Sequence, residues 1–316
     1  MNIEKLNEIL KKDILAEPVS LEDYIFIESL IDIVKSIHIP QCNFTHDYNV
    51  PLDVTMNLSL DFIKSIDKKY YNKMIYALNN QKIVFVHENI SDVPAVISIN
   101  GEKIIRLVYN NTIYDAYTYT HEGFHYINMD LTKTSINWEL MTETISITAE
   151  ALQKQVLKDY SSIYPEYNLN EIYNMYAIKI KAYKLEFEIN LMKHFMKYGY
   201  VDDDAIIGLL NNKSDEYKDC VYDDLIEIMD NGFMSFDYLQ RYVIAGVLSS
   251  HILERIRYNF NDLSEFKYLN DNMYNMGFVD TLKMLDLSLD DEELVILSND
   301  SIKLLRKEYK KRIINM

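Results

Sequence analysis

The spacing of apolar and polar residues predicts a mainly helical chain. Apolar side chains recur every three or four residues over most of its length, as expected when one face of each helix is buried. This spacing, together with residues typical of helix ends, predicts helices over residues 2–12, 20–38, 58–78, 169–198, 202–211, 214–229, 235–258, 262–276 and 289–314. No repeat or Gly/Ser-rich linker interrupts the pattern, and only seven glycines occur. We therefore expect one continuous domain, with residues 1–80 as a helical segment packed on residues 81–316.

One part of the chain has a different pattern. Residues 82–87 are rich in β-branched and aromatic side chains, and the apolar-rich segments 95–99 and 103–109 flank Asn100-Gly101. An Asn-Gly pair supplies the positive φ angles that a two-residue type I′ hairpin turn needs. The sequence thus predicts a small antiparallel β-sheet directly before the next helix. An exposed edge strand there would offer hydrogen bonds to an extended peptide, although a purely structural hairpin fits the pattern equally well.

The segment after the sheet carries the strongest chemical signal in the chain. His121, Glu122 and His125 form the pattern H-E-x-x-H. On a helix, residues i and i+4 lie one turn apart on the same face, so both imidazoles can bind one Zn²⁺. Glu122 would then lie beside the metal as a general base. Aromatic neighbours predict that this helix is buried, and buried His and Glu side chains are costly unless they are paired or bind a metal.

A catalytic zinc ion needs a third protein ligand and an open position. The next predicted helix carries an acidic stripe, where Glu139, Glu143 and Glu150 lie at helical spacing, and seventeen residues separate His125 from Glu143. We expect Glu143 to be the third ligand, with Glu139 as the alternative. Glu150 or Glu139 would accept a hydrogen bond from a zinc-binding imidazole and fix its tautomer.

Other sequence features add less. Cys42 and His46 are four residues apart, but no second ligand pair lies near them, so a loop is favoured over a metal site. The net charge of −17 argues against nucleic-acid or anionic-membrane partners. Two cysteines suit a reducing compartment, and neither a signal peptide nor a run of about 18 apolar residues is visible. We expect a cytoplasmic protein.

The motifs resemble those of the thimet oligopeptidase and oligoendopeptidase F group of zinc peptidases. Residues 115–125 are similar to that group's D-V-x-T-L-x-H-E-x-G-H. Residues 143–152 are similar to its E-V-A-S-T-x-x-E-x-L, in which the first Glu is the zinc ligand. The resemblance thus also implies that Glu143 binds zinc. Weaker similarities extend it over roughly residues 83–300, in segments 187–199, 238–246 and 273–277.

The chain also departs from that group's pattern. Gly123 stands one place earlier than the usual glycine, and the connection to the third ligand is shorter. When the two are aligned on the Tyr-rich stretch, the position of the group's transition-state histidine falls near Gly232 of this chain. No His lies between His194 and His251. By resemblance, Tyr238 or Tyr242 would donate a hydrogen bond to the oxyanion instead, although either tyrosine could equally be an ordinary packing residue.

The sequence therefore predicts a helical zinc peptidase domain with a small sheet beside its active-site helix. It would hydrolyse oligopeptides, or a specific peptide-like precursor, with one Zn²⁺ on His121, His125 and Glu143 and with Glu122 as the base. The alternative is a peptide-binding protein of the same fold whose zinc is structural or non-catalytic. Members of the group are usually about twice as long and have an N-terminal lobe, so a more open cleft is expected here.

Overall fold

A computed structural model describes most of the chain. The described residues are 2–16, 31–32, 35, 49–87, 94–129, 136–157, 167–232, 234–256, 263–275 and 283–285. The helices are α1 (Ile3–Ala16), α3 (Leu52–Ile66), α4 (Lys68–Asn79), α5 (Tyr114–Asn128), α6 (Ile136–Val156), α7 (Tyr167–Tyr198), α8 (Asp203–Leu210), α9 (Asp215–Asn231), α10 (Met234–Ile256), α11 (Ser264–Asn272) and the 3₁₀ turn η3 (Met273–Asn275). The helix predicted over 289–314 and most of the one over 20–38 lie outside the described residues.

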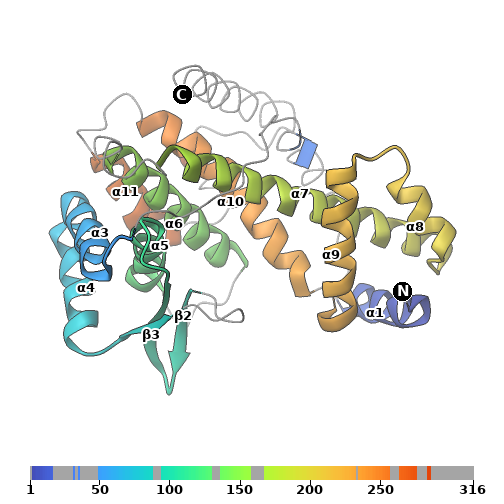
Figure 1. The fold of residues 1–316 in the computed structure, drawn as a ribbon, viewed down its shortest axis with the longest axis horizontal. Coiled ribbons are helices and arrows are strands. Elements are labelled where there is room, and N and C mark those ends of the chain that lie inside the picture. The colour runs from blue at the N-terminus through green and yellow to red at the C-terminus, as the bar shows by residue number, and fades with distance from the viewer. Residues whose placement is uncertain are drawn as a thin grey trace.

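The predicted fold class, mainly α with a small sheet, is confirmed (Figure 1). None of the described helices combines the length and the apolar character that crossing a membrane requires.

The sheet contains β1 (Ile83–His87), β2 (Ala95–Ile99) and β3 (Glu102–Tyr109) in the order β1-β3-β2. The predicted hairpin is present: β2 and β3 are antiparallel, and Asn100 and Gly101 have φ angles of 53° and 80°. The expectation of a wholly antiparallel sheet was wrong for β1, which runs parallel to β3 with Ile83 opposite Ile105. The reason is that β1 pairs with β3 and not with its sequence neighbour β2, and the hairpin between β2 and β3 turns β3 back into the direction of β1.

The helix predicted over residues 58–78 is in fact two helices. Asp67 has extended backbone angles, φ −158° and ψ 132°, and its side chain accepts a hydrogen bond from the Lys69 N–H at the start of α4. This N-cap satisfies a donor that the first turn would otherwise leave unpaired. α3 also begins earlier than predicted, at Leu52 directly after Pro51.

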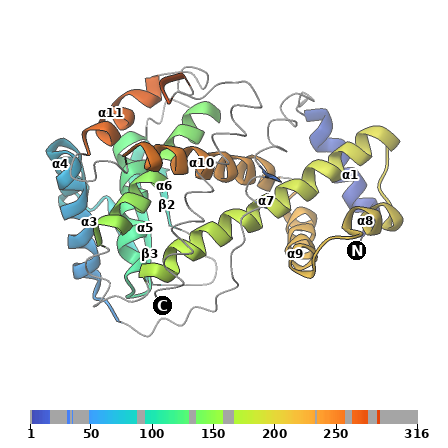
Figure 2. The ribbon, with the colours of Figure 1, turned by 90° about the horizontal axis from the view of Figure 1, so that it is seen from above.

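The helices are arranged around α5 and α6, which pack side by side near the sheet (Figures 1 and 2). α3 packs on α5, and α10 packs on both α6 and α7. α7 extends to the far end of the molecule, where α1 packs against α7 and α9. The first 80 residues therefore contribute helices at both ends, and their grouping into one segment stays a prediction.

The zinc-motif helix α5 is buried among the other elements. Phe124 is fully buried, with its ring 6.0 Å from that of Tyr70 and 5.4 Å from that of Phe266 between centroids. A Cβ atom at Gly123 would lie 3.3 Å from Met74 Cε, so the glycine allows α5 to approach α4 closely. Gly123 and Phe124, the two positions that depart from the peptidase motif, thus have packing roles.

Candidate metal centre

The start of α5 is fixed to the sheet by Asp115. Its buried carboxylate accepts hydrogen bonds from the backbone N–H groups of Asn110, at 3.0 Å, and of Thr112, at 3.2 Å. A carboxylate in the first turn is also favoured by the helix dipole. In addition, the Ser59 hydroxyl of α3 donates to the Ala116 carbonyl at 2.6 Å. These contacts set where α5 begins relative to β3 and α3.

The end of α5 is fixed by two lysines. Lys73 Nζ lies 2.9 Å from the Ile127 carbonyl oxygen, and Lys103 Nζ lies 2.8 Å from the Met129 carbonyl oxygen. The last carbonyls of a helix have no partner within the helix, and cations there are favoured by its dipole. The histidines between the two ends are therefore carried on a helix held at both termini.

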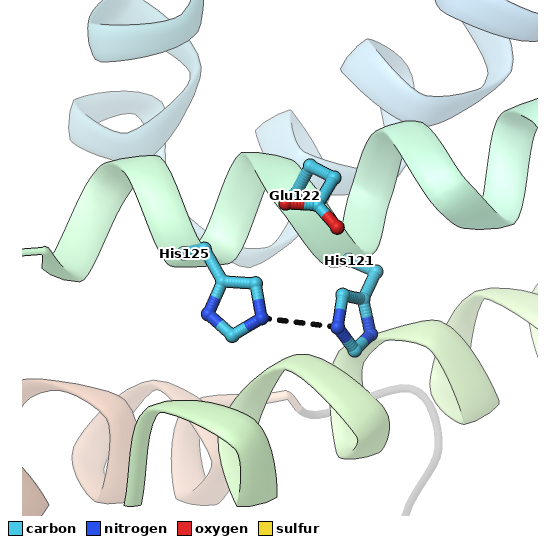
Figure 3. Close-up of side chains that lie close together, drawn as sticks. All are labelled: His121, Glu122 and His125. Atoms are coloured by element: carbon cyan, nitrogen blue, oxygen red, sulfur yellow. Dashed lines mark hydrogen bonds between the residues drawn. The ribbon is translucent and has the colours of Figure 1, made fainter. Parts of the chain in front are cut away.

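His121 and His125 place their rings together, as their spacing predicts. The two Nε2 atoms are 3.0 Å apart, and both rings leave α5 on one side with Glu122 between them along the helix (Figure 3). Glu143 of α6 faces them: its carboxylate oxygens lie 3.5 Å from His121 Nε2 and 3.6 Å from His125 Nε2. The structure thus brings together the three ligands expected from sequence.

The spacing of these donor atoms is close to that around a tetrahedral zinc ion. With metal–ligand distances near 2.0–2.1 Å, two ligand atoms of a tetrahedron are about 3.3 Å apart. The two Nε2 atoms are 3.0 Å apart, and each has a different oxygen of Glu143 at 3.5 or 3.6 Å. One Glu143 oxygen is buried without a hydrogen-bond partner among the described residues. Glu122 offers an oxygen within 4.8 Å of a nitrogen on each histidine. We assign it a different role because Glu143 lies closer to both Nε2 atoms.

The other two carboxylates of the acidic stripe have separate partners. Glu150 Oε2 lies 3.4 Å from Nδ1 of His121, on the side of the ring away from Glu143, and Glu150 also forms an ion pair with the buried Lys154. Glu139 instead pairs with Arg241 of α10 at 2.6 Å. Of the two candidates for orienting an imidazole, Glu150 is the one near a ring nitrogen, but His121 Nδ1 forms no hydrogen bond to a described residue, so the orienting role of Glu150 stays a prediction.

The buried charges of the centre shift one another's pKa values. Although burial disfavours the imidazolium of His121, the carboxylates of Glu143 and Glu150 raise its pKa to about 10. Burial likewise opposes ionisation of Glu143 and Glu150, but neighbouring basic side chains, chiefly His125 for Glu143 and Lys154 for Glu150, lower the pKa of each carboxyl. The group therefore attracts a positive charge, which a metal cation would supply in place of protons.

Glu122 has an environment suited to a base. It is buried, and its Oε2 has no hydrogen-bond partner among the described residues. Burial raises the pKa of Glu122 in spite of the two histidines, bringing it nearer to the range in which a carboxylate exchanges protons effectively.

The centre opens into a pocket of 310 Å³ between the sheet, α5, α6 and α10. Its described lining residues are Pro94, Ala95, Val96, Glu122, His125, Met129, Glu139, Thr142, Glu143, Arg241 and Tyr242. The pocket therefore joins the edge strand β2 to the candidate ligands and the candidate base.

The two tyrosines expected from the resemblance have different outcomes. Tyr242 lines the pocket, and Lys181 Nζ of α7 lies 4.2 Å from the centre of its ring. Tyr238 belongs to α10, but its side chain lies outside the described residues, as do Cys42 and His46. Gly232 ends α9 with a φ angle of 76°. Gly232, near which the resemblance places the peptidase group's histidine, therefore ends a helix, and the oxyanion role of either tyrosine stays a prediction.

Sequence reasoning missed two residues of the site. Lys154 is four residues after Glu150, a spacing that permits an ion pair, so the signal for it was present. Arg241 lies between Tyr238 and Tyr242, and nothing in its local sequence indicates that it faces a pocket.

No family model matches the chain, and no curated protein matches its sequence. Two solved structures share its fold. One is a candidate oligoendopeptidase F from Bacillus anthracis str. Ames, with a TM-score of 0.57 and 13% sequence identity over 98% of this chain and 57% of that one. The other is a candidate peptidase from Chlamydophila abortus, with a TM-score of 0.54 and 15% identity over 97% of this chain and 54% of that one. The chain thus has a peptidase-like fold and spans about half the length of both structures.

Proposed function

We propose that the protein is a zinc-dependent metallopeptidase that hydrolyses oligopeptides. The observation that carries this proposal is the convergence of His121, His125 and Glu143, whose side-chain nitrogens and oxygens approach to 3.0–3.6 Å, with Glu122 beside them in the same pocket. A purely structural zinc site is normally closed by four protein ligands and needs no general base. The peptidase-like fold supports the same reading.

Each side chain has a defined task in this reaction. His121, His125 and Glu143 would hold the zinc ion, which when bound polarises the scissile carbonyl and makes a water molecule at the site more acidic. Glu122 takes the proton from the attacking water and then delivers it to the leaving amine. Glu150 keeps the His121 ring oriented through Nδ1, and Lys154 holds Glu150 in place.

The edge strand β2 would align the substrate. Because the strand order is β1-β3-β2, one side of β2 has no partner strand among the described residues. Ala95 and Val96 at its start line the pocket. An extended peptide that pairs with β2 would be held by backbone hydrogen bonds with its scissile bond beside Glu122.

Tyr242 is the better placed of the two candidate oxyanion donors, since it lines the pocket. A preorganised donor of this kind is worth about 3–4 kcal/mol in the transition state. We expect Tyr242→Phe to lower kcat by roughly 100- to 1,000-fold with little change in KM. An unchanged kcat would assign Tyr242 to packing alone.

Metal analysis tests the ligand set. We expect about one zinc ion per chain in the wild-type protein and a loss of zinc in the His121→Ala variant. The matched control is His194→Ala, since His194 of α7 stacks on Tyr198 outside the site and its loss should leave zinc unchanged. Equal zinc content in all three proteins would contradict the proposed ligands.

The Glu122→Gln variant tests the base. It keeps the size of the side chain but cannot accept a proton, so zinc should stay bound while hydrolysis falls by at least about 100-fold. Near-normal hydrolysis would refute the role of Glu122. Peptide binding without hydrolysis in the zinc-loaded wild-type protein would instead indicate a binding protein.

A further inference from the structure

The pocket beside the candidate centre has an unusual charge distribution. Glu122, Glu139 and Glu143 line it, and Arg241 is the permanently cationic side chain among its described lining residues. In a chain with a net charge of −17, an anionic group entering this pocket would be repelled by the surrounding carboxylates unless it reached Arg241 or the metal.

Arg241 has more N–H donors than its ion pair with Glu139 uses. Its recorded contact joins Nη2 to one oxygen of Glu139 at 2.6 Å, and its side chain is 29% exposed. A guanidinium carries five N–H donors in a planar fork. Glu139 therefore fixes the arginine in the pocket wall, while the remaining N–H groups have no partner among the described residues.

We propose that Arg241, held by Glu139, binds a carboxylate of the substrate peptide and so selects where the chain is cleaved. The inference rests on the proposed peptidase function. A planar guanidinium matches a carboxylate through two parallel hydrogen bonds, which a neutral peptide carbonyl cannot form equally well.

The position of Arg241 limits which carboxylate can reach it. Glu139 precedes Glu143 by one helical turn, a distance of about 5–6 Å between Cβ atoms, and Arg241 lies against Glu139. An extended peptide advances about 3.3–3.6 Å per residue. The bound carboxylate therefore belongs to a residue within a few positions of the scissile bond. It is either the C-terminal carboxylate or the side chain of an Asp or Glu.

Binding measurements separate these two sources. The zinc-loaded Glu122→Gln protein, which should not cleave, is titrated with fluorescently labelled peptides and followed by anisotropy. One pair of peptides differs only in a free or an amidated C-terminus. A second, amidated set carries Asp or Asn at successive positions. We expect the carboxylate form in at least one set to bind about tenfold or more tightly, as charge-assisted hydrogen bonds allow.

Variants of Arg241 test whether this side chain causes the carboxylate preference. Arg241→Gln should reduce it to about twofold or less, and Arg241→Lys, which keeps the charge but not the fork, should give an intermediate value. Arg255→Gln is the matched control: Arg255 is also on α10, is 30% exposed and pairs with Glu265 away from the pocket, so its loss should leave the preference intact. Equal affinity for both forms in both sets, or a preference that survives Arg241→Gln, overturns the inference.

Hydrolysis of the same peptides by the wild-type protein keeps the two proposals apart. If the peptides are cleaved without any carboxylate preference, the proposed role of Arg241 is contradicted and the proposed peptidase function is not. A carboxylate preference in binding, with no cleavage of any peptide, supports that role and contradicts the proposed peptidase activity.

Discussion

Lys154 is a residue whose charge is buried almost completely. Its side chain is 1% exposed, it pairs with Glu150, and its Nζ lies 5.1 Å from the centre of the Tyr117 ring. Burial lowers the pKa of Lys154, which Glu150 partly offsets. A buried ion pair contributes little to stability as a pair, but removing one partner leaves an uncompensated charge.

The Lys154→Met variant should therefore unfold more easily, by about 3–5 kcal/mol, because Glu150 loses its counter-ion. Urea unfolding of the metal-free wild type and variants gives their free energies of unfolding. The Lys154→Met/Glu150→Gln double variant removes both charges and should recover most of the loss. A single variant as stable as the wild type would show that Glu150 does not depend on Lys154.

Asp224 of α9 provides a test at a site remote from the metal centre. It is fully buried, neither carboxylate oxygen has a hydrogen-bond partner among the described residues, and Lys184 Nζ lies 3.8 Å away. Burial, only partly opposed by Lys184, raises the pKa of Asp224 from 3.8 to about 7. The folded protein thus holds a proton that the unfolded chain has released, so this carboxyl lowers stability progressively as pH rises from about 4 to about 7.

Asp224→Asn should remove that effect. We expect the variant to be more stable than the wild type at pH 8, by on the order of 1 kcal/mol or more, and to gain less at pH 5. Urea unfolding of the variant and the wild type at both pH values gives the difference in their free energies of unfolding. The contributions of other titrating groups are common to both proteins and cancel in this difference. A gain that is the same at both pH values would contradict the raised pKa.

At the scale of residues, sequence reasoning was strongest where the chemistry depends on local spacing. The i and i+4 relation of His121 and His125 follows from helix geometry alone. The sequence did not distinguish Glu139 from Glu150 as the partner of an imidazole, because that choice depends on how α6 is oriented relative to α5. Arg241 comes from a third helix, so its pairing with Glu139 depends on tertiary packing that no local pattern reports.

At the scale of elements, Phe124 links α5 to α4 and α11. Its ring is fully buried between Tyr70 and Phe266. Truncating a buried phenylalanine removes its apolar contacts and leaves a cavity. The packing of α5 should therefore be sensitive to this one side chain.

Phe124→Ala should lower the free energy of unfolding by about 3–5 kcal/mol. Tyr200→Ala is the control, since Tyr200 is 55% exposed and its truncation should change stability by about 0.5 kcal/mol or less. Urea unfolding of both variants decides the outcome. Similar stabilities for the two would contradict the close packing of α5.

The elements also show where sequence patterns fail. The Asn100-Gly101 turn was predictable because its φ requirements are local. The break at Asp67 was missed because apolar spacing continues through it, although an Asp ahead of a new helical turn is a typical N-cap. The parallel direction of β1 was not predictable from its own residues, since strand order is set by distant contacts.

At the scale of the whole molecule, the larger of two apolar clusters among the described residues runs from Leu6 of α1 to Leu285. The candidate metal centre lies where α5 and α6 meet beside the sheet, and the pocket adds β2 and α10. The candidate functional groups thus come from elements far apart in sequence, although the candidate ligands lie within residues 121–143. The approach of these three side chains was predictable from the sequence, whereas the residues that line the pocket beside them were not.

Peptide hydrolysis with and without bound zinc tests the central claim most directly. The protein is incubated with a mixed peptide library as purified, after zinc removal with a chelator, and after zinc is added back, and mass spectrometry identifies the products. We predict cleaved peptides in the first and third samples and none in the second. Cleavage that persists after zinc removal, or no cleavage in any sample, would contradict the account.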